Sequence, residues 1–161
     1  MLEVLRPLAV QFEANGRQLL NAISDMSSSQ WLERLGQGSN HAAFLALHLL
    51  DARCHVLGLV GVSVSHGFEE IGKHATRLED IPEYPTPSDI ARSWRRVSDV
   101  LTTVLAEVTA DRLERPSPHR FPVDDATILG AISFLAHHEA YHLGQLGLIR
   151  AAIGMTPLSF S

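Results

Sequence analysis

Several residue types are scarce in this sequence, and each scarcity excludes a class of protein. The chain has one cysteine, Cys54, so it cannot form an internal disulfide. Its 13 lysine and arginine residues include only one lysine, and the formal net charge is −5. Nucleic-acid backbones attract clustered cations, so we expect no nucleic-acid partner. No run of about 18 uncharged apolar residues occurs, so we expect no membrane span either.

The N-terminus also lacks the features of a secretory signal, which are a cationic start, an apolar stretch and a small-residue cleavage site. We therefore expect a cytoplasmic protein. The chain does contain enough apolar sequence for a core, because 45% of its 161 residues are hydrophobic and 19% are charged. This composition is typical of a folded globular protein. We expect a single domain over residues 1–161.

Four segments have the apolar periodicity of helices that bury one face. They cover residues 2–24, 40–62, 87–110 and 126–153. The third has the clearest start, because Thr86 can cap it, Pro87 suits its first position and Asp89 can complete a capping box. Ser39 and Asn40 are the capping candidates for the second segment. No segment has the alternating pattern of a strand, so the sequence predicts an all-α protein.

The connections between these segments are uneven in length. Residues 63–86 form a link of 24 residues that contains two prolines, and such a length is uncommon unless the link crosses the bundle or has a function. The second helix would be about 33 Å long, which the link can span. The four helices can therefore run up-down-down-up, with a long crossover between helices two and three, or simply up-down-up-down.

Histidine is unusually abundant, with nine residues against six phenylalanines. His138 and His142 are four residues apart, which places both imidazoles on one face of the fourth helix. That face is otherwise apolar, and burying an unpaired imidazole costs roughly a few kcal/mol. The pair is therefore a candidate for two ligands of one metal ion. Hydrogen bonds to the backbone or between the two rings are the alternative.

A third ligand has to come from elsewhere, and the second helix offers His41, His48 and His55 at seven-residue intervals. These share one face but lie about 10 Å apart along the axis, so only one can be level with the pair. If the second and fourth helices are antiparallel, that residue is His48. If they are parallel, it is His55 or the neighbouring Cys54, which is otherwise expected to be a small buried apolar residue.

Residues 138–142 also read His-Glu-Ala-Tyr-His, which matches the zinc-protease pattern with Glu139 as general base. That chemistry needs a further ligand, and no His, Asp, Glu or Cys follows His142. Gln145 and Leu148 also occupy the positions where the extended pattern requires Gly and His. We therefore do not expect a protease.

The sequence resembles the DinB/YfiT superfamily, small bacterial four-helix proteins with a histidine in the middle of helix two and a His-x-x-x-His-x-Gly-Gln stretch in helix four. Here His48 lies within Leu-Ala-Leu-His-Leu-Leu-Asp-Ala, and residues 138–145 read His-Glu-Ala-Tyr-His-Leu-Gly-Gln. The resemblance covers nearly the whole chain, including Gln-Trp at 30–31, the long second connection and the closing Gly154-x-x-Pro157. It implies a four-helix bundle in up-down-down-up order, which is the arrangement that selects His48.

The resemblance also implies a divalent metal ion, zinc or nickel, on His48, His138 and His142, with its other positions open to water. Gln145 is expected to orient a ligand rather than bind the ion. Characterised relatives include metal-dependent transferases and isomerases that use low-molecular-weight thiols, and others are described only by a hydrolase assignment. We therefore expect a metal-dependent enzyme that activates a thiol or water for attack on a small molecule, and, as is common in the family, a homodimer.

Two other functions stay open, a non-catalytic metal-binding or stress-response bundle and a bundle whose histidines are satisfied core residues. A thiol's carboxylate could be held by Arg53 or Arg77, and nothing in the sequence chooses between them. Asp51, one turn after His48, could orient that imidazole but is more typical of a solvated helix residue. His41 and His137 are expected to have packing or surface roles.

Overall fold

The four predicted helices are the long elements of the structure, a computed structural model that describes residues 1–72, 78, 81 and 83–158. They are α1 (Arg6–Ile23), α3 (Ala42–Leu59), α5 (Pro87–Glu107) and α7 (Ile128–Ala152). Shorter helical turns flank them: η1 (Glu3–Leu5), α2 (Ser28–Trp31), α4 (Glu69–Gly72) and α6 (Ala110–Leu113). The described residues contain no strand, only an isolated bridge between Pro116 and Thr127. The all-helical prediction is confirmed.

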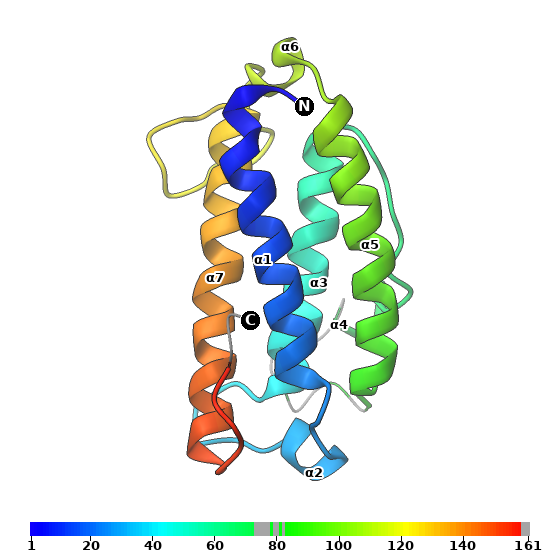
Figure 1. Cartoon of the computed structure of the whole chain (residues 1–161), viewed down its shortest axis with the longest axis vertical. Helices are drawn as coiled ribbons and strands as arrows, with labels where there is room; N and C mark the ends of the chain where they lie inside the picture. Colours follow the sequence, from blue (N-terminus) through cyan, green and yellow to red (C-terminus); the bar gives the residue numbers. More distant parts are fainter. Residues whose placement is uncertain (73–77, 79–80, 82, 159–161) are drawn as a thin grey trace.

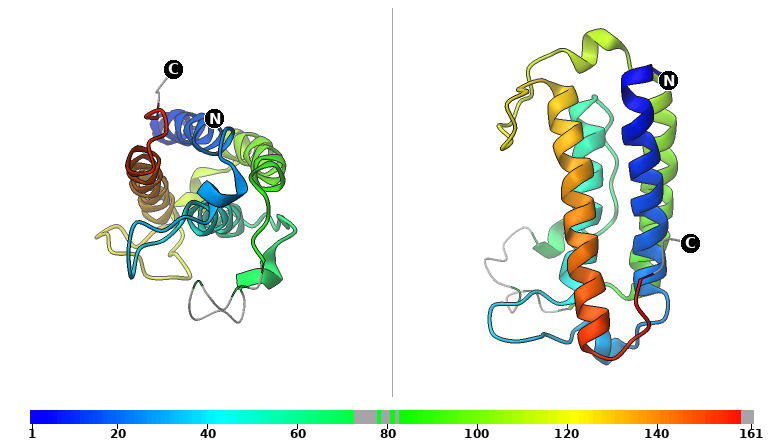
Figure 2. Two further views of the ribbon diagram at one scale, coloured as in Figure 1. Left: turned by 90° about the horizontal axis from the view of Figure 1, so that it is seen from below. Right: turned by 60° about the vertical axis from the view of Figure 1, so that its left-hand side comes forward.

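The four long helices stand side by side, as Figure 1 shows, with α1 and α7 running in one direction and α3 and α5 in the other. Viewed along the bundle in Figure 2, their order around the axis is α1, α5, α3, α7. Each helix therefore packs against two neighbours, and α3 lies against α5 and α7. The described part of the connection between α3 and α5 returns along the outside of the bundle.

Local signals explain where α5 begins. Thr86 Oγ1 accepts a hydrogen bond from the Asp89 backbone N–H, and the Asp89 carboxylate accepts one from the Thr86 backbone N–H. This is the predicted capping box, with Pro87 at the first helical position where its missing N–H costs nothing.

The start of α3 differs from the prediction. The helix begins at Ala42, later than expected, so its cap is His41 and neither Ser39 nor Asn40. The His41 Nδ1 atom accepts a hydrogen bond from the Phe44 backbone N–H at 3.1 Å, which is the bond that a serine or asparagine oxygen normally accepts.

Apolar side chains from all four long helices fill the centre of the bundle. Examples that are at most 2% exposed are Leu19 of α1, Leu49 of α3, Leu101 of α5 and Leu146 of α7. The helices differ in how these residues are distributed. Apolar residues of α5 lie on one face, whereas those of α3 and α7 are spread all around the helix.

α3 is also long and apolar enough to cross a membrane by length and composition alone, with a mean hydropathy of 1.4 over 18 residues. However, 67% of this stretch is buried inside the structure, between the other helices. A helix at the core of a bundle meets the same criterion because it is apolar on most sides.

Candidate metal centre

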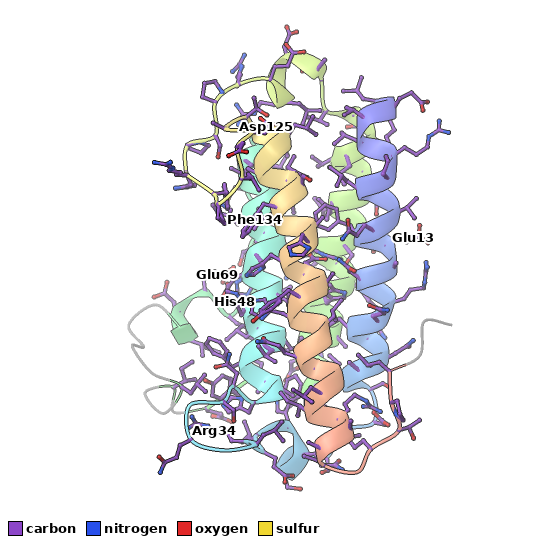
Figure 3. All side chains as sticks on the ribbon, turned by 90° about the vertical axis from the view of Figure 1, so that its left-hand side faces the viewer. Glu13, Arg34, His48, Glu69, Asp125 and Phe134 are labelled. Atoms are coloured by element: carbon purple, nitrogen blue, oxygen red, sulfur yellow. The ribbon has the colours of Figure 1, made fainter. Side chains whose placement is uncertain are left out.

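Three histidines meet on the seam between α3 and α7. The Nε2 atom of His138 lies 3.1 Å from Nε2 of His48 and 3.0 Å from Nε2 of His142. Figure 3 shows His48 on α3 where that helix lies against α7. Because the two helices run in opposite directions, His48 is the residue of its helix that is level with the pair. The structure thus brings together the three residues that the sequence singled out.

The hydrogen atoms of these rings cannot satisfy all three Nε2 atoms. A neutral imidazole carries one N–H and one lone pair. His142 donates its Nδ1 hydrogen to Gln145 Oε1 at 2.7 Å, so its Nε2 carries the lone pair. His138 Nε2 can carry at most one hydrogen, yet it faces both His48 Nε2 and His142 Nε2. Hydrogen bonds between the rings therefore leave lone pairs of neighbouring Nε2 atoms facing each other. A cation between the rings would bind these lone pairs.

A metal ion fits this donor set. Two imidazole nitrogens that bind one tetrahedral zinc ion at about 2.0–2.1 Å lie about 3.3 Å from each other. The Nε2 separations of 3.0 and 3.1 Å are slightly shorter than that, and all three ligand atoms lie within 4.8 Å of one another. His138 Nδ1 is buried without a hydrogen-bond partner among the described residues. With Nε2 bound to an ion this nitrogen would carry the hydrogen of the ring, so no described residue holds His138 in that tautomer as Gln145 holds His142.

Gln145, expected from the sequence to orient a ligand, contacts His142. Its Oε1 accepts from His142 Nδ1, and its Nε2 donates to the Tyr141 hydroxyl oxygen at 3.3 Å. The amide is thus held at both ends. The arrangement keeps His142 in the tautomer whose Nε2 lone pair points toward the other two histidines.

Burial and mutual repulsion favour the neutral form of His138 and His48. Desolvation, followed by the charges of His142, His48 and His137, lowers the pKa of His138 to about 4. Desolvation and then His142 also lower the pKa of His48, which Asp51 partly opposes. Neutral imidazole is the form that binds a metal ion.

The three rings remain partly exposed. Two phenylalanines shield the flanks. The Phe44 ring stacks parallel to His48 with centroids 5.9 Å apart, and the Phe134 ring lies 6.0 Å from His138. A separate cavity of about 520 Å³ lies between α1 and α5, and none of the three histidines lines it.

Other histidines and Cys54 have different surroundings. His41 caps α3 and packs edge-on against Tyr84, with centroids 4.5 Å apart. His55 lies 5.0 Å from the ring of His119. His137 is exposed, and Cys54 is half-buried, with a thiol pKa that burial raises to about 11. None of these residues joins the three-histidine cluster, so the alternatives of His55 and Cys54 as third ligand do not apply.

Arg53 and Glu139 are not available for the roles considered from sequence. Both side chains are 1% exposed, and they form a two-bonded ion pair. Arg53 Nε and Nη2 donate to the two Glu139 oxygens at 2.9 and 2.8 Å. A buried, paired guanidinium cannot hold a thiol's carboxylate, and a buried, paired carboxylate cannot act as a protease base. The other candidate anchor, Arg77, lies outside the described residues.

Sequence reasoning missed His66, which holds the crossover link beside the site. This residue is 2% exposed, and its Nε2 is 2.6 Å from Asp51 Oδ1. Its carbonyl oxygen also accepts a hydrogen bond from Ser93 Oγ at 2.9 Å. Asp51 therefore orients His66 rather than His48. No motif or helical spacing marks a histidine in a link, so its partner could only be found in three dimensions.

Comparison with known proteins agrees with this fold. A family model of the DinB superfamily matches residues 11–146, a range that includes all three histidines. The crystal structure of a DinB-like protein from Bacillus subtilis, YjoA, is similar, with a TM-score of 0.67 and 16% sequence identity over 96% of each chain. At that identity the likeness concerns the fold alone. No match was found among curated proteins. From the family match, this chain belongs to the DinB superfamily.

Proposed function

We propose that this chain binds one divalent metal ion, zinc or nickel, through His48, His138 and His142, and that it is a metal-dependent enzyme acting on a small molecule. The observation that carries the proposal is the convergence of three Nε2 atoms that their own hydrogens cannot pair. Membership of the DinB superfamily is consistent with it.

A bound ion would supply Lewis acidity and make a water or a low-molecular-weight thiol easier to deprotonate. The chain's own residues prepare the position. Three neutral imidazoles leave the ion its full positive charge, and Gln145 keeps His142 in the binding tautomer. Phe44 and Phe134 pack beside His48 and His138, and the three histidine rings stay partly exposed. Hydrolysis and transfer to or from a thiol are the two reaction types that this arrangement suits.

Metal analysis of the untagged protein tests the first part of the proposal. We expect about one divalent ion per chain in the wild type and in His137→Ala, because His137 is the exposed neighbour of His138. His48→Ala and His142→Ala should lose the ion. Absence of metal from the wild type after incubation with zinc or nickel would refute the site.

Activity separates the enzyme from its alternative, a non-catalytic metal-binding or stress-response protein. The metal-loaded and metal-stripped proteins would be compared with activated esters, and with electrophiles plus a small thiol. Metal-dependent turnover that His142→Ala abolishes would support the enzyme. Metal binding without any such turnover would favour the alternative.

We further infer that the scaffold is the up-down-down-up four-helix bundle expected from the resemblance, which the helix directions in Figure 1 support. A single domain over residues 1–161, a homodimer, a cytoplasmic location and the absence of nucleic-acid and membrane partners stay predictions.

A further inference from the structure

We infer that the buried Arg53–Glu139 ion pair positions the metal ligands, by fixing how α7 is rotated and aligned against α3. This inference rests on the proposed metal site. Arg53 follows His48 by five residues on α3, and Glu139 comes directly after His138 on α7. The pair therefore bridges the same two helices as the histidines, within about 8 Å along α3.

Successive helical residues point about 100° apart, so Glu139 faces the centre of the bundle when His138 faces the seam. Donors on two other helices fix the position of the Glu139 carboxylate. Glu139 accepts two bonds from Arg53 and one from Asn15 Nδ2 of α1 at 3.3 Å. Any other rotation of α7 would remove the carboxylate from these donors.

Arg53 is held as firmly, by the two helices that do not carry the metal ligands. Its Nη2 donates to the Phe12 carbonyl oxygen of α1 at 2.9 Å, and its Nη1 donates to Ser98 Oγ of α5 at 2.6 Å. The guanidinium carbon also lies 3.7 Å from the ring centroid of Trp94. All four long helices thus contribute to one polar cluster.

Stability alone does not account for this cluster. Well-packed apolar residues of similar volume are often as stabilising as a buried ion pair, or more so. The pair adds a geometric constraint, because a guanidinium and a carboxylate form two parallel bonds only when one edge of the guanidinium lies in plane with the carboxylate. Its effect is on geometry more than on the free energy of unfolding.

The two helices that it joins need such a constraint. α5 has one apolar face, which by itself determines the side that turns inward. Apolar residues surround α3 and α7, so their hydrophobic pattern leaves the rotation of each poorly determined. If α7 turned by one residue, it would present His137 and Tyr141 to His48 in place of His138 and His142. The Arg53–Glu139 pair excludes that alternative.

The decisive variant is the double substitution Arg53→Met/Glu139→Leu, which replaces the pair with apolar side chains and leaves no unpaired charge. We would measure zinc affinity by competition with a chromophoric chelator, the visible spectrum of the cobalt-loaded protein, and the thermal midpoint. We expect a folded helical protein whose zinc affinity falls by about 10- to 100-fold and whose cobalt spectrum differs from that of the wild type.

Arg150→Met is the matched control, because Arg150 is a buried α7 arginine that pairs with Asp25, away from the histidines. It should lower the thermal midpoint and leave the cobalt spectrum unchanged. If the double variant does not fold, Arg53→Lys decides, since lysine keeps the charge but cannot form two parallel bonds, and we expect weaker zinc binding.

The inference would be overturned if the folded double variant had the zinc affinity and the cobalt spectrum of the wild type. If the double variant does not fold, the same result in Arg53→Lys would overturn it. Either result would leave the proposed metal site intact. Failure of the wild type itself to bind zinc or cobalt would overturn the proposed function, and the inference with it. The two failures are therefore distinguishable.

Discussion

The hydrogen on His142 Nδ1 determines what the three-histidine cluster can bind. Gln145 Oε1 accepts a hydrogen bond from His142 Nδ1, so the opposite nitrogen of the ring carries its lone pair toward His138. The Gln145 amide thereby selects the tautomer of His142 with the hydrogen on Nδ1, which leaves Nε2 able to bind a metal ion.

Gln145→Ala should consequently weaken zinc binding by about 10- to 100-fold, because His142 can then adopt the other tautomer and other ring orientations. Competition with a chromophoric chelator measures the change. Tyr141→Phe is the control, since it removes only the acceptor of the Gln145 amino group. Zinc affinity in Gln145→Ala equal to that of the wild type would show that the amide does not orient the ligand.

His138 should make the stability of the metal-free protein depend on pH. Burial lowers the pKa of His138 from 6.5 to about 4 in the folded chain. Between these values the unfolded chain binds more protons, so the free energy of unfolding falls as the pH falls from about 6.5 to about 4. Urea unfolding across this range, with chelator present, would be compared between wild type and His138→Gln. A pH slope equal in the two proteins would contradict the assignment.

At the scale of helices, the capping box of α5 is a local feature whose contribution can be isolated. Thr86→Ala removes the hydroxyl that accepts from Asp89 N–H, and should lower the free energy of unfolding by about 1 kcal/mol. Thr103→Ala is the control, because Thr103 is an exposed residue near the end of α5 whose hydroxyl donates to the carbonyl oxygen of Asp99. Chemical denaturation measures both. Similar losses of unfolding free energy in Thr86→Ala and Thr103→Ala would mean that the capping hydrogen bond does not contribute specifically to stability.

Helix positions could be predicted because caps and apolar spacing are properties of neighbouring residues. Thr86 and Asp89 illustrate this, since their types and spacing suffice to place the start of α5. His41 shows the limit, because an imidazole can replace a capping oxygen and few sequence rules include that case.

The candidate site was predictable where it depended on helical spacing, and unpredictable where it depended on packing. The four-residue interval between His138 and His142, and the level of His48 in an antiparallel pair, could be worked out in advance. The partners of Arg53 and His66 could not, because they lie on other helices or in a link. Which polar residues pair inside a bundle depends on the rotation of each helix, and apolar residues all around α3 and α7 leave that rotation unspecified.

At the scale of the whole molecule, a metal ion would connect two helices that are distant in sequence. Binding to the folded chain alone adds stability, by about 2.7 kcal/mol when the free ion is at 100 times its dissociation constant. We therefore expect zinc to raise the thermal midpoint of the wild type. Hydrogen exchange should slow most in the middle of α3 and α7.

His138→Ala serves as the comparison for this effect, because it removes the histidine that contacts both others. Zinc should leave its thermal midpoint and its exchange rates unchanged. An equal rise in the midpoint of His138→Ala would indicate that the ion stabilises the chain elsewhere.

The order of the ligands along the chain has a consequence for biosynthesis. His48 precedes His138 by 90 residues, and two of the three ligands belong to α7, the last of the long helices. A growing polypeptide that has not yet reached α7 offers the ion a single ligand of this set. If the proposed ion binds, all three of its ligands are present only after α7 has been translated, so metallation would follow synthesis of the last long helix.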